Sequence, residues 1–236
     1  MDDWFLKAHE FLYLKEEEGS DEETRFLVAA LGLQEGSRVL DAPCAAGRIG
    51  VRLAHAGCQV TGVDINRRFL LLARQRFGEE GVSGSFCVMD LRRLAFRPAF
   101  DAAINWWSSF GYFSDAENLQ VLQGMAAALR PGGCVAIEQP NRQWVLRRFV
   151  PGLEYGPWRL LSRWDAARER MESTWVLEEA GELKVYPMSM RWYTLTQLRR
   201  LFRRAGLVPE AAYGAYDGSP YRPSSLRLIL IGRKPE

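Results

Sequence analysis

The pattern of apolar and polar residues changes its period repeatedly along this chain, and each change separates a predicted strand from a predicted helix. Residues 39–41, Val-Leu-Asp, predict a short buried strand, and residues 47–55 follow with apolar positions at helical spacing. The alternation continues with a strand that ends at Asp64 and with predicted strands at residues 85–89, 100–106 and 134–138. Strands that alternate with helices are typical of an α/β protein with a parallel sheet.

Two parts of the chain depart from this alternation. The first 36 residues have apolar positions at helical spacing and no strand, which predicts N-terminal helices. Between residues 141 and 192 the pattern indicates antiparallel strands, at 168–177 and 183–192, around a turn at 179–182. A last helix and two strands follow at residues 197–205, 207–213 and 225–232. The expected helix caps along the chain are Ser20 or Asp21, Asn66, Asp115, and Thr194 or Thr196. We therefore predict one domain over residues 1–236, with helices in 1–36 and a cap insertion at 141–192.

The turn between the first strand and its helix is built from small residues. Residues 42–47, with the sequence APCAAG, contain no bulky side chain, so backbone N–H groups can lie against a ligand at the start of the next helix. Asp64 follows Asp41 by 23 residues and falls where such a βαβ unit presents a carboxylate to the two hydroxyls of a ribose. This spacing predicts a site for a nucleoside cofactor.

The residues around this turn resemble a known family. The segment VLDAPCAAGR resembles the LDxPCGxGR form of the first motif of class I S-adenosylmethionine (SAM) dependent methyltransferases, and VTGVDIN resembles their second motif. The turn LRPGG at residues 129–133 is a further similarity. The resemblance implies a Rossmann-like seven-stranded sheet of order 3-2-1-4-5-7-6, with strand 7 antiparallel and helices on both faces. It also implies SAM as the cofactor and S-adenosylhomocysteine as its product, with the N-terminal helices over the cofactor site.

The resemblance also implies which residues contact the cofactor. An acidic residue after the third strand, here Asp90, accepts a hydrogen bond from the adenine amino group in the family, and its apolar neighbour covers the ring. The family usually has glycine where this chain has Ala45, which is strained by about 1 kcal/mol if that position needs a positive φ and otherwise only narrows the pocket. The expected cofactor-binding residues are Asp41, Ala42, Cys44, Ala45, Gly47, Asp64, Ile65, Met89, Asp90, Leu91 and Asn105.

An aromatic stretch follows the fourth strand at residues 105–113, NWWSSFGYF, where ligands sit in open α/β sheets. We expect Trp106 and Tyr112 to face the substrate and other rings of the stretch to pack in the core. Tyr13, in the first predicted helix, is a further substrate candidate. No catalytic dyad is visible, so the catalytic residues stay unknown. Methyl transfer from SAM needs mainly alignment of the reacting atoms, and we expect transfer to N or O of a small molecule.

Composition excludes several other classes. The formal net charge of +2 divides into −5 over residues 1–140 and +7 over residues 141–236, but the basic residues follow amphipathic helical spacing and no RNA-binding module is visible, so no nucleic-acid partner is expected. Two histidines and four scattered cysteines give no metal site, and no apolar run is long enough to cross a membrane. These features predict a cytoplasmic protein, as monomer or homodimer, with reduced thiols.

Two alternatives stay open at this point. Residues 45–50 match the dinucleotide fingerprint G-x-G-x-x-G with alanine first, which would suit an NAD(P)-dependent oxidoreductase. The second alternative is a homologue that binds SAM without catalysis.

Overall fold

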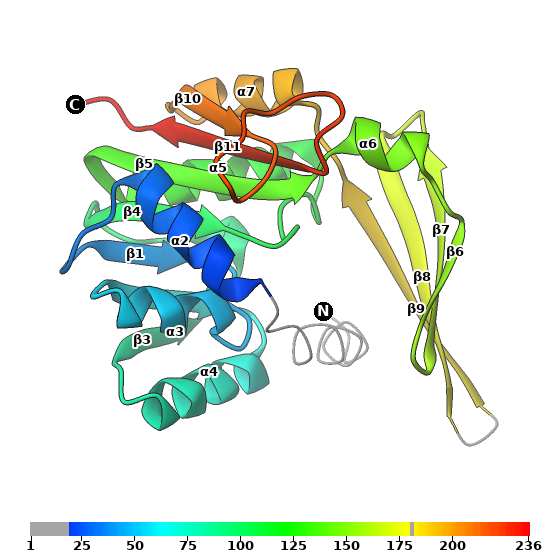
Figure 1. Cartoon of the computed structure of the whole chain (residues 1–236), viewed down its shortest axis with the longest axis horizontal. Coiled ribbons are helices and arrows are strands. Elements are labelled where there is room, and N and C mark those ends of the chain that lie inside the picture. Colours follow the sequence, from blue (N-terminus) through cyan, green and yellow to red (C-terminus); the bar gives the residue numbers. More distant parts are fainter. Residues whose placement is uncertain (1–18, 180–181) are drawn as a thin grey trace.

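A computed structural model describes residues 19–179 and 182–236 (Figure 1). The predicted helix at residues 3–18, and with it Tyr13, lies outside the described residues. Within them, no helix is both long and apolar enough to span a membrane.

A seven-stranded sheet forms the centre of the fold, with the order β3-β2-β1-β4-β5-β11-β10. Neighbours among β1 to β5 run parallel, whereas β11 runs antiparallel to both β5 and β10. When the strands of this sheet alone are numbered along the chain, the order is 3-2-1-4-5-7-6, which confirms the prediction. The strands are β1 Arg38–Asp41, β2 Gln59–Asp64, β3 Gly84–Val88, β4 Phe100–Asn105, β5 Leu129–Pro140, β10 Val208–Tyr213 and β11 Arg227–Arg233.

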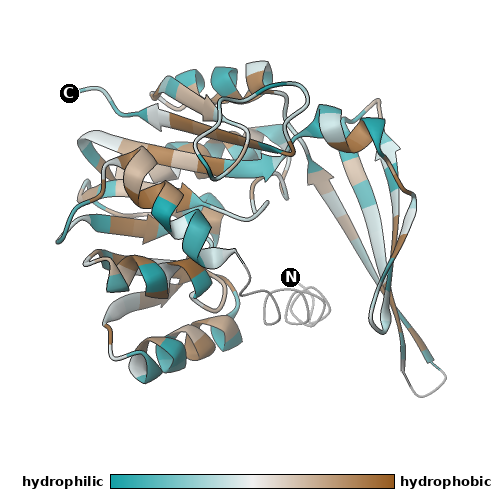
Figure 2. Cartoon of the chain, in the orientation of Figure 1, coloured by the Kyte–Doolittle hydropathy of each residue, from teal (hydrophilic) through white to brown (hydrophobic). Residues whose placement is uncertain are grey.

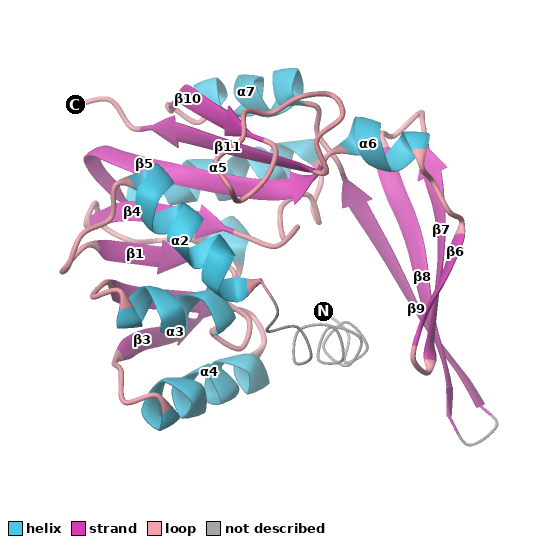
Figure 3. Ribbon diagram, viewed as in Figure 1, coloured by secondary structure: helices cyan, strands magenta, loops and turns pink. Residues whose placement is uncertain are grey.

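Helices cover both faces of this sheet (Figure 3). On one face lie α2 (Ser20–Leu31), α3 (Arg48–His55) and α4 (Arg67–Glu79), and on the other lie α5 (Asp115–Ala128) and α7 (Leu195–Arg204). The central strands are largely apolar along their length (Figure 2), and their alternate side chains belong to two separate cores, one on each face. In β5, for example, Ala136 packs toward α2 and α3, whereas Val135 and Ile137 pack toward α5 and α7.

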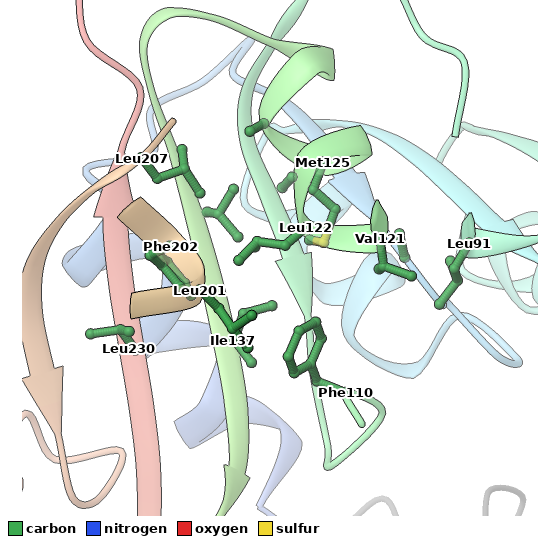
Figure 4. Packing of buried hydrophobic residues seen from close by; sticks show 14 of the residues in the cluster. Leu91, Phe110, Val121, Leu122, Met125, Ile137, Leu201, Phe202, Leu207 and Leu230 are labelled. Carbon is green, nitrogen blue, oxygen red and sulfur yellow. The ribbon is translucent and has the colours of Figure 1, made fainter. Parts of the chain in front are cut away.

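The core beneath α5 and α7 also holds one ring of the aromatic stretch. Leu122 and Met125 of α5, Ile137 of β5 and Phe202 of α7 have no exposed surface, and Phe110 packs among them with 1% exposure (Figure 4). Burial of each such side chain stabilises the fold by about 1.5–3 kcal/mol. Phe110 therefore fixes the middle of the stretch to the core, as expected for some of its rings.

Four helix starts test the predicted caps. Asn66 caps α4 through its side chain, as predicted, and Thr194, one of the two residues expected there, caps α7. The prediction of Asp115 for α5 is wrong, because the Ser114 side chain accepts a hydrogen bond from the Glu117 N–H and Glu117 returns one, in a capping box. For α2, Gly19 in the left-handed region takes the position that we had expected for Ser20 or Asp21.

The insertion forms a second, four-stranded antiparallel sheet of order β6-β7-β8-β9, after the short helix α6 (Arg142–Arg147). Its strands are β6 Gly152–Tyr155, β7 Trp158–Asp165, β8 Arg170–Glu179 and β9 Glu182–Arg191. The hairpin of β8 and β9 agrees with the prediction, whereas β6 and β7 were not predicted. The sheet projects beside the core at the carboxyl ends of the central strands (Figure 1). We call residues 141–192 the cap.

The two ends of the cap meet at one place on the core. The side chain of Gln139 donates from Nε2 to the carbonyl of Tyr193 and accepts from the Tyr193 backbone N–H at 3.4 Å. Next to it, Asn141 donates to the carbonyl of Ser225 at 2.7 Å. The chain therefore leaves and re-enters the core beside the same pair of residues.

Candidate active site

A cavity of about 360 Å³ lies at the carboxyl ends of β1 to β4, between the core and the cap. Ligand sites in open α/β sheets lie at this edge, because the turns that follow the strands converge there. Of the residues expected to bind cofactor or substrate, ten line the cavity: Asp41, Cys44, Ala45, Asp64, Ile65, Met89, Asp90, Leu91, Trp106 and Tyr112. We describe its walls in turn.

The small-residue turn forms the wall next to β1. Ala45 has φ 44°, in the left-handed region that favours glycine, and its backbone N–H donates to Oδ2 of Asp64 at 3.0 Å. The strained alternative considered for this position therefore holds. Gly47 has φ 76° and does not line the cavity; a Cβ there would lie 3.1 Å from that of Ala73, so its role is close helix packing. Ala42 is likewise fully buried behind the lining.

Asp64 stands at the end of β2 with 7% of its surface exposed. Its Oδ1 accepts a hydrogen bond from the Asn66 N–H at 2.8 Å, and its Oδ2 accepts the bond from Ala45. Burial raises the pKa of Asp64 to about 6, although these backbone donors oppose the rise. Because a carboxylate can accept about four hydrogen bonds, Asp64 keeps room for a ligand hydroxyl beside these backbone donors.

Asp41, at the end of β1, is a second carboxyl group in the lining of the cavity and is 3% exposed. Burial raises its pKa to about 8; the positive charge of Arg48 opposes this, and the negative charge of Asp64 adds to it. A cation bound beside Asp41 would reverse the shift by stabilising the charged form.

The residues that follow β3 form another wall of the cavity. Asp90 caps the short 3-10 helix Leu91–Arg93 and pairs with Arg92 at 2.7 Å, and these contacts with Arg92 hold its pKa below the usual range. Met89 and Leu91, on either side of Asp90, line the cavity with apolar surface. A carboxylate between two apolar side chains suits a flat base with an amino group.

Asn66 also lines the cavity and was predicted only as a helix cap. Its Oδ1 accepts the hydrogen bond that caps α4, so the amide nitrogen points the other way. That Nδ2 is buried and has no hydrogen-bond partner. An unpaired buried donor at a cavity wall suits a hydrogen-bond acceptor of a ligand. In the sequence, the feature that could have identified Asn66 is its position two residues after the acidic residue of the second motif.

The aromatic stretch supplies the wall after β4. Trp106 and Tyr112 line the cavity where we expected them. Trp107 and Phe113, which we expected to pack in the core, line it as well, so the prediction was wrong for these two rings. Asn105 does not line it: the residue is fully buried, and its Nδ2 donates to the carbonyl of Ala42 at 2.8 Å. Its side chain therefore holds the turn after β1 against β4. Asn105 was expected to contact the cofactor, but it can act on the cavity only through this turn.

An ion pair holds this wall against α2. Arg48, at the start of α3, lines the cavity and pairs with Glu23 through both ends of its guanidinium, at 2.8 and 3.1 Å. Glu23 is 3% exposed and also accepts a hydrogen bond from the indole of Trp106 at 2.7 Å. The Arg48 guanidinium lies 5.5 Å from the ring centre of Trp107. The charge of Arg48 is thus neutralised behind the wall.

The cap closes the cavity opposite the sheet through residues 187–189 of β9. Arg170 of β8 ties this roof to the aromatic stretch: its guanidinium donates to the carbonyls of Phe113 at 3.0 Å, Tyr112 at 3.2 Å and Gly111 at 3.3 Å. It also donates to the carbonyl and the hydroxyl of Ser189, at 2.9 and 2.6 Å. The aromatic wall and the roof therefore form one connected unit.

Sequence reasoning did not assign the cap residues of the cavity, because the roof meets the aromatic stretch through Arg170, whose partners lie 57 to 59 residues earlier in the chain. The other lining residues that we did not predict extend turns already assigned. The twelve are Pro43, Ala46, Arg48, Ile49, Asn66, Phe69, Trp107, Ser109, Phe113, Pro187, Met188 and Ser189.

The cavity fits SAM. It combines a small-residue turn, carboxyl groups after three successive strands and an aromatic wall, which suit an adenosine and a cationic sulfonium. Among the residues that the structure describes, no cluster of potential metal ligands is found.

Comparisons with known proteins agree with this geometry. The sequence model of a family described as "Methyltransferase domain" matches residues 39–133, which include the first two motifs and the turn before residue 134. A curated relative, the cypemycin N-terminal methyltransferase of a Streptomyces species, is 28% identical over 208 residues, which cover 84% of this chain and 83% of the relative.

Solved structures show the same fold. The CcbJ methyltransferase of Streptomyces caelestis superimposes with a TM-score of 0.77 at 17% identity and covers 92% of this chain and 95% of its own. SAM-bound CalS10, an amino pentose methyltransferase of Micromonospora echinaspora, has a TM-score of 0.64 at 20% identity, with 99% and 98% covered. The comparisons support the methyltransferase interpretation over the nicotinamide one, and the antiparallel β11 agrees with it. The family match over residues 39–133, the curated relative and the shared fold together support a class I SAM-dependent methyltransferase.

Proposed function

We propose that this methyltransferase transfers the methyl group of SAM to an amine nitrogen of a small-molecule acceptor. Within the cavity we assign Asp64 to the ribose hydroxyls, Asp90 with Met89 and Leu91 to the adenine, and Asp41 to the cationic methionine end. The aromatic wall and the roof face the acceptor. SAM supplies a methyl group on a good leaving group, so these residues have to bind, align and exclude water.

The observation that carries the choice of nitrogen is the chemistry of the acceptor end. Its described lining consists of Trp106, Trp107, Tyr112 and Phe113, with Ser109 and residues 187–189, and includes neither histidine nor lysine. An amine reacts as a neutral nucleophile without a base, whereas a hydroxyl benefits from one. Aromatic faces also stabilise a cationic ammonium product by about 0.5–2 kcal/mol per good contact.

The charge of the cavity supports the same choice. Asp41, Asp64 and Asp90 line it, against one arginine that is already paired with Glu23. No unpaired cationic side chain of the described lining is therefore available to bind a carboxylate acceptor. The name of the cypemycin relative describes methylation at an N-terminus, which is also an amine, and this agrees with the proposal.

The test is a screen of acceptors in matched sets, in which an amine, an alcohol or phenol, and a carboxylate share one carbon skeleton. S-Adenosylhomocysteine is quantified by mass spectrometry, and SAM with a deuterated methyl group identifies the methylated atom. We expect turnover with amines and little with their oxygen counterparts. Consistent preference for a phenol or carboxylate would contradict the proposal, while leaving the SAM-dependent activity intact.

A further inference from the structure

The turn that follows β4 holds two consecutive residues in the left-handed region. Trp107 has φ 56° and Ser108 has φ 61°. Neither is glycine, and in this region a Cβ atom is crowded by its own backbone, so the conformation persists only where the surroundings hold it. Trp107 lines the cavity and Ser108 lies just outside the lining. The turn therefore joins a strained backbone to a ring of the active site.

A carboxylate with no exposed surface lies behind this turn. Glu138, near the end of β5, is 0% exposed. Its Oε2 accepts a hydrogen bond from the backbone N–H of Ser108 at 2.9 Å, and its Oε1 accepts one from Nη1 of Arg227 at 2.7 Å. A carboxylate is tolerated in the interior only when its oxygens have such partners. Glu138 thus links the turn to β11.

Arg227 is itself held in place. It is on β11, and its guanidinium lies 4.6 Å from the ring centre of Tyr216. On the cavity side, the ring of Trp107 lies over Arg48, which is paired with Glu23. The turn thus lies between two ion pairs, Glu138 with Arg227 on one side and Glu23 with Arg48 on the other. We infer that the hydrogen bond from Ser108 to Glu138 determines its position between these pairs.

We propose that Glu138 is a positioning residue of this methyltransferase: by accepting the Ser108 N–H it keeps residues 107 and 108 left-handed and so keeps the Trp107 ring on the cavity wall. Glu138 does not line the cavity, so its effect passes through the turn. The proposal uses the methyltransferase activity but does not depend on which acceptor is methylated.

Two substitutions separate positioning from general stability. Glu138→Gln keeps the size of the side chain, but an amide has one oxygen for two donors, so its nitrogen faces either Ser108 or Arg227 as a second donor. Ser108→Gly relieves the crowding at positive φ and lets the turn form without the carboxylate. Glu210→Gln is the matched control, because Glu210 also pairs with an arginine, Arg233 at 2.7 Å, but lies outside the cavity.

The dissociation constant of SAM is measured by titration calorimetry, and kcat and KM are measured with an acceptor from the screen. We expect Glu138→Gln to raise the dissociation constant of SAM or the acceptor KM by about tenfold, which corresponds to 1.4 kcal/mol. Adding Ser108→Gly to Glu138→Gln should restore most of that loss, and Glu210→Gln should match the wild type. Tryptophan fluorescence should report the displaced ring in Glu138→Gln and its return in the double variant.

Wild-type binding and KM in Glu138→Gln would overturn the proposal. A loss that Ser108→Gly does not reverse would also overturn it, because Glu138 would then support only stability. If Glu138→Gln does not fold, Ser108→Pro breaks the same turn while the pair of Glu138 and Arg227 stays, since proline has no N–H and fixes φ near −65°. It should show the same loss, and unchanged SAM binding together with an unchanged acceptor KM would refute the assignment. The calorimetry needs no acceptor, so failure of the amine proposal does not affect it.

Discussion

Replacement of Asp41 by asparagine should stabilise the empty enzyme and weaken its binding of SAM. Burial raises the pKa of Asp41 from 3.8 to about 8. At 1.36 kcal/mol per unit, the folded state at pH 7 loses about 4 kcal/mol by having to keep this group protonated or bury its charge. A buried asparagine with unpaired amide atoms costs about 1–3 kcal/mol. The net gain is about 2 kcal/mol, or roughly 4–8 °C in Tm for a chain of this size.

The sign of the pH dependence follows from the same shift. The pKa of Asp41 is higher in the folded protein than in the unfolded chain, so its contribution to stability is complete below about pH 4 and is lost as the pH rises through about 8. Asparagine does not titrate. By the same arithmetic, Asp41→Asn should be less stable than the wild type near pH 4, where only the cost of its buried amide remains, and its relative stability should rise with pH to an advantage of about 2 kcal/mol near pH 7 to 8.

Thermal unfolding from pH 4 to 8.5, with and without SAM, measures both effects. The surface variant Asp21→Asn is a matched control, because Asp21 is 75% exposed and pairs only with Arg52 among the contacts described. Without SAM, Asp41→Asn should melt above the wild type at pH 8; with SAM, the wild type should gain more. The α-amino group of SAM titrates near pH 8 as well, so the difference between the two proteins is the quantity to compare. A difference in Tm that is independent of pH would refute the reasoning.

Three further predictions concern the turn, the ribose site and the roof. Ala45→Gly removes the crowding at φ 44°. The greater freedom of glycine in the unfolded chain offsets part of this gain, so the free energy of unfolding should rise by about 0.5–1 kcal/mol, measured as a higher Tm. A lower Tm would contradict the strain argument. Asp64→Ala should weaken SAM binding by roughly 1.5–3 kcal/mol, because hydrogen bonds to a charged group are lost, and calorimetry that finds the wild-type affinity would mean that the ribose lies elsewhere. Arg170→Ala should raise the acceptor KM by about tenfold with little change in SAM affinity, because it frees the roof from the carbonyls of residues 111–113. Faster hydrogen exchange of residues 111–113 is the independent readout. An unchanged KM would show that the roof does not shape the acceptor site.

The sheet and the cofactor half of the site were predictable because their signals are local. The small-residue turn, Asp64 and Asp90 each follow a strand at a spacing that the sequence displays directly. The conformation of Ala45 could not be predicted, because its positive φ occurs together with a hydrogen bond to Asp64, 19 positions later in the chain.

The acceptor half depends on contacts between distant segments. Arg170 reaches carbonyls 57 to 59 residues earlier in the chain, and no local pattern marks it. β7 was missed because the adjacent Leu160 and Leu161 interrupt its alternation. Glu138 looked like the last residue of an apolar strand, and its partners come from residues 30 and 89 positions away.

The shared junction of the cap, where Gln139 and Tyr193 bond to each other, gives the chain a natural place for excision. A short linker between these two positions would delete the roof and leave every strand of the central sheet in sequence. Such a miniature protein should still capture SAM while accepting a wider range of nucleophiles. Exchanging only the excised piece between relatives would then transfer the choice of acceptor without disturbing the machinery that holds the methyl donor.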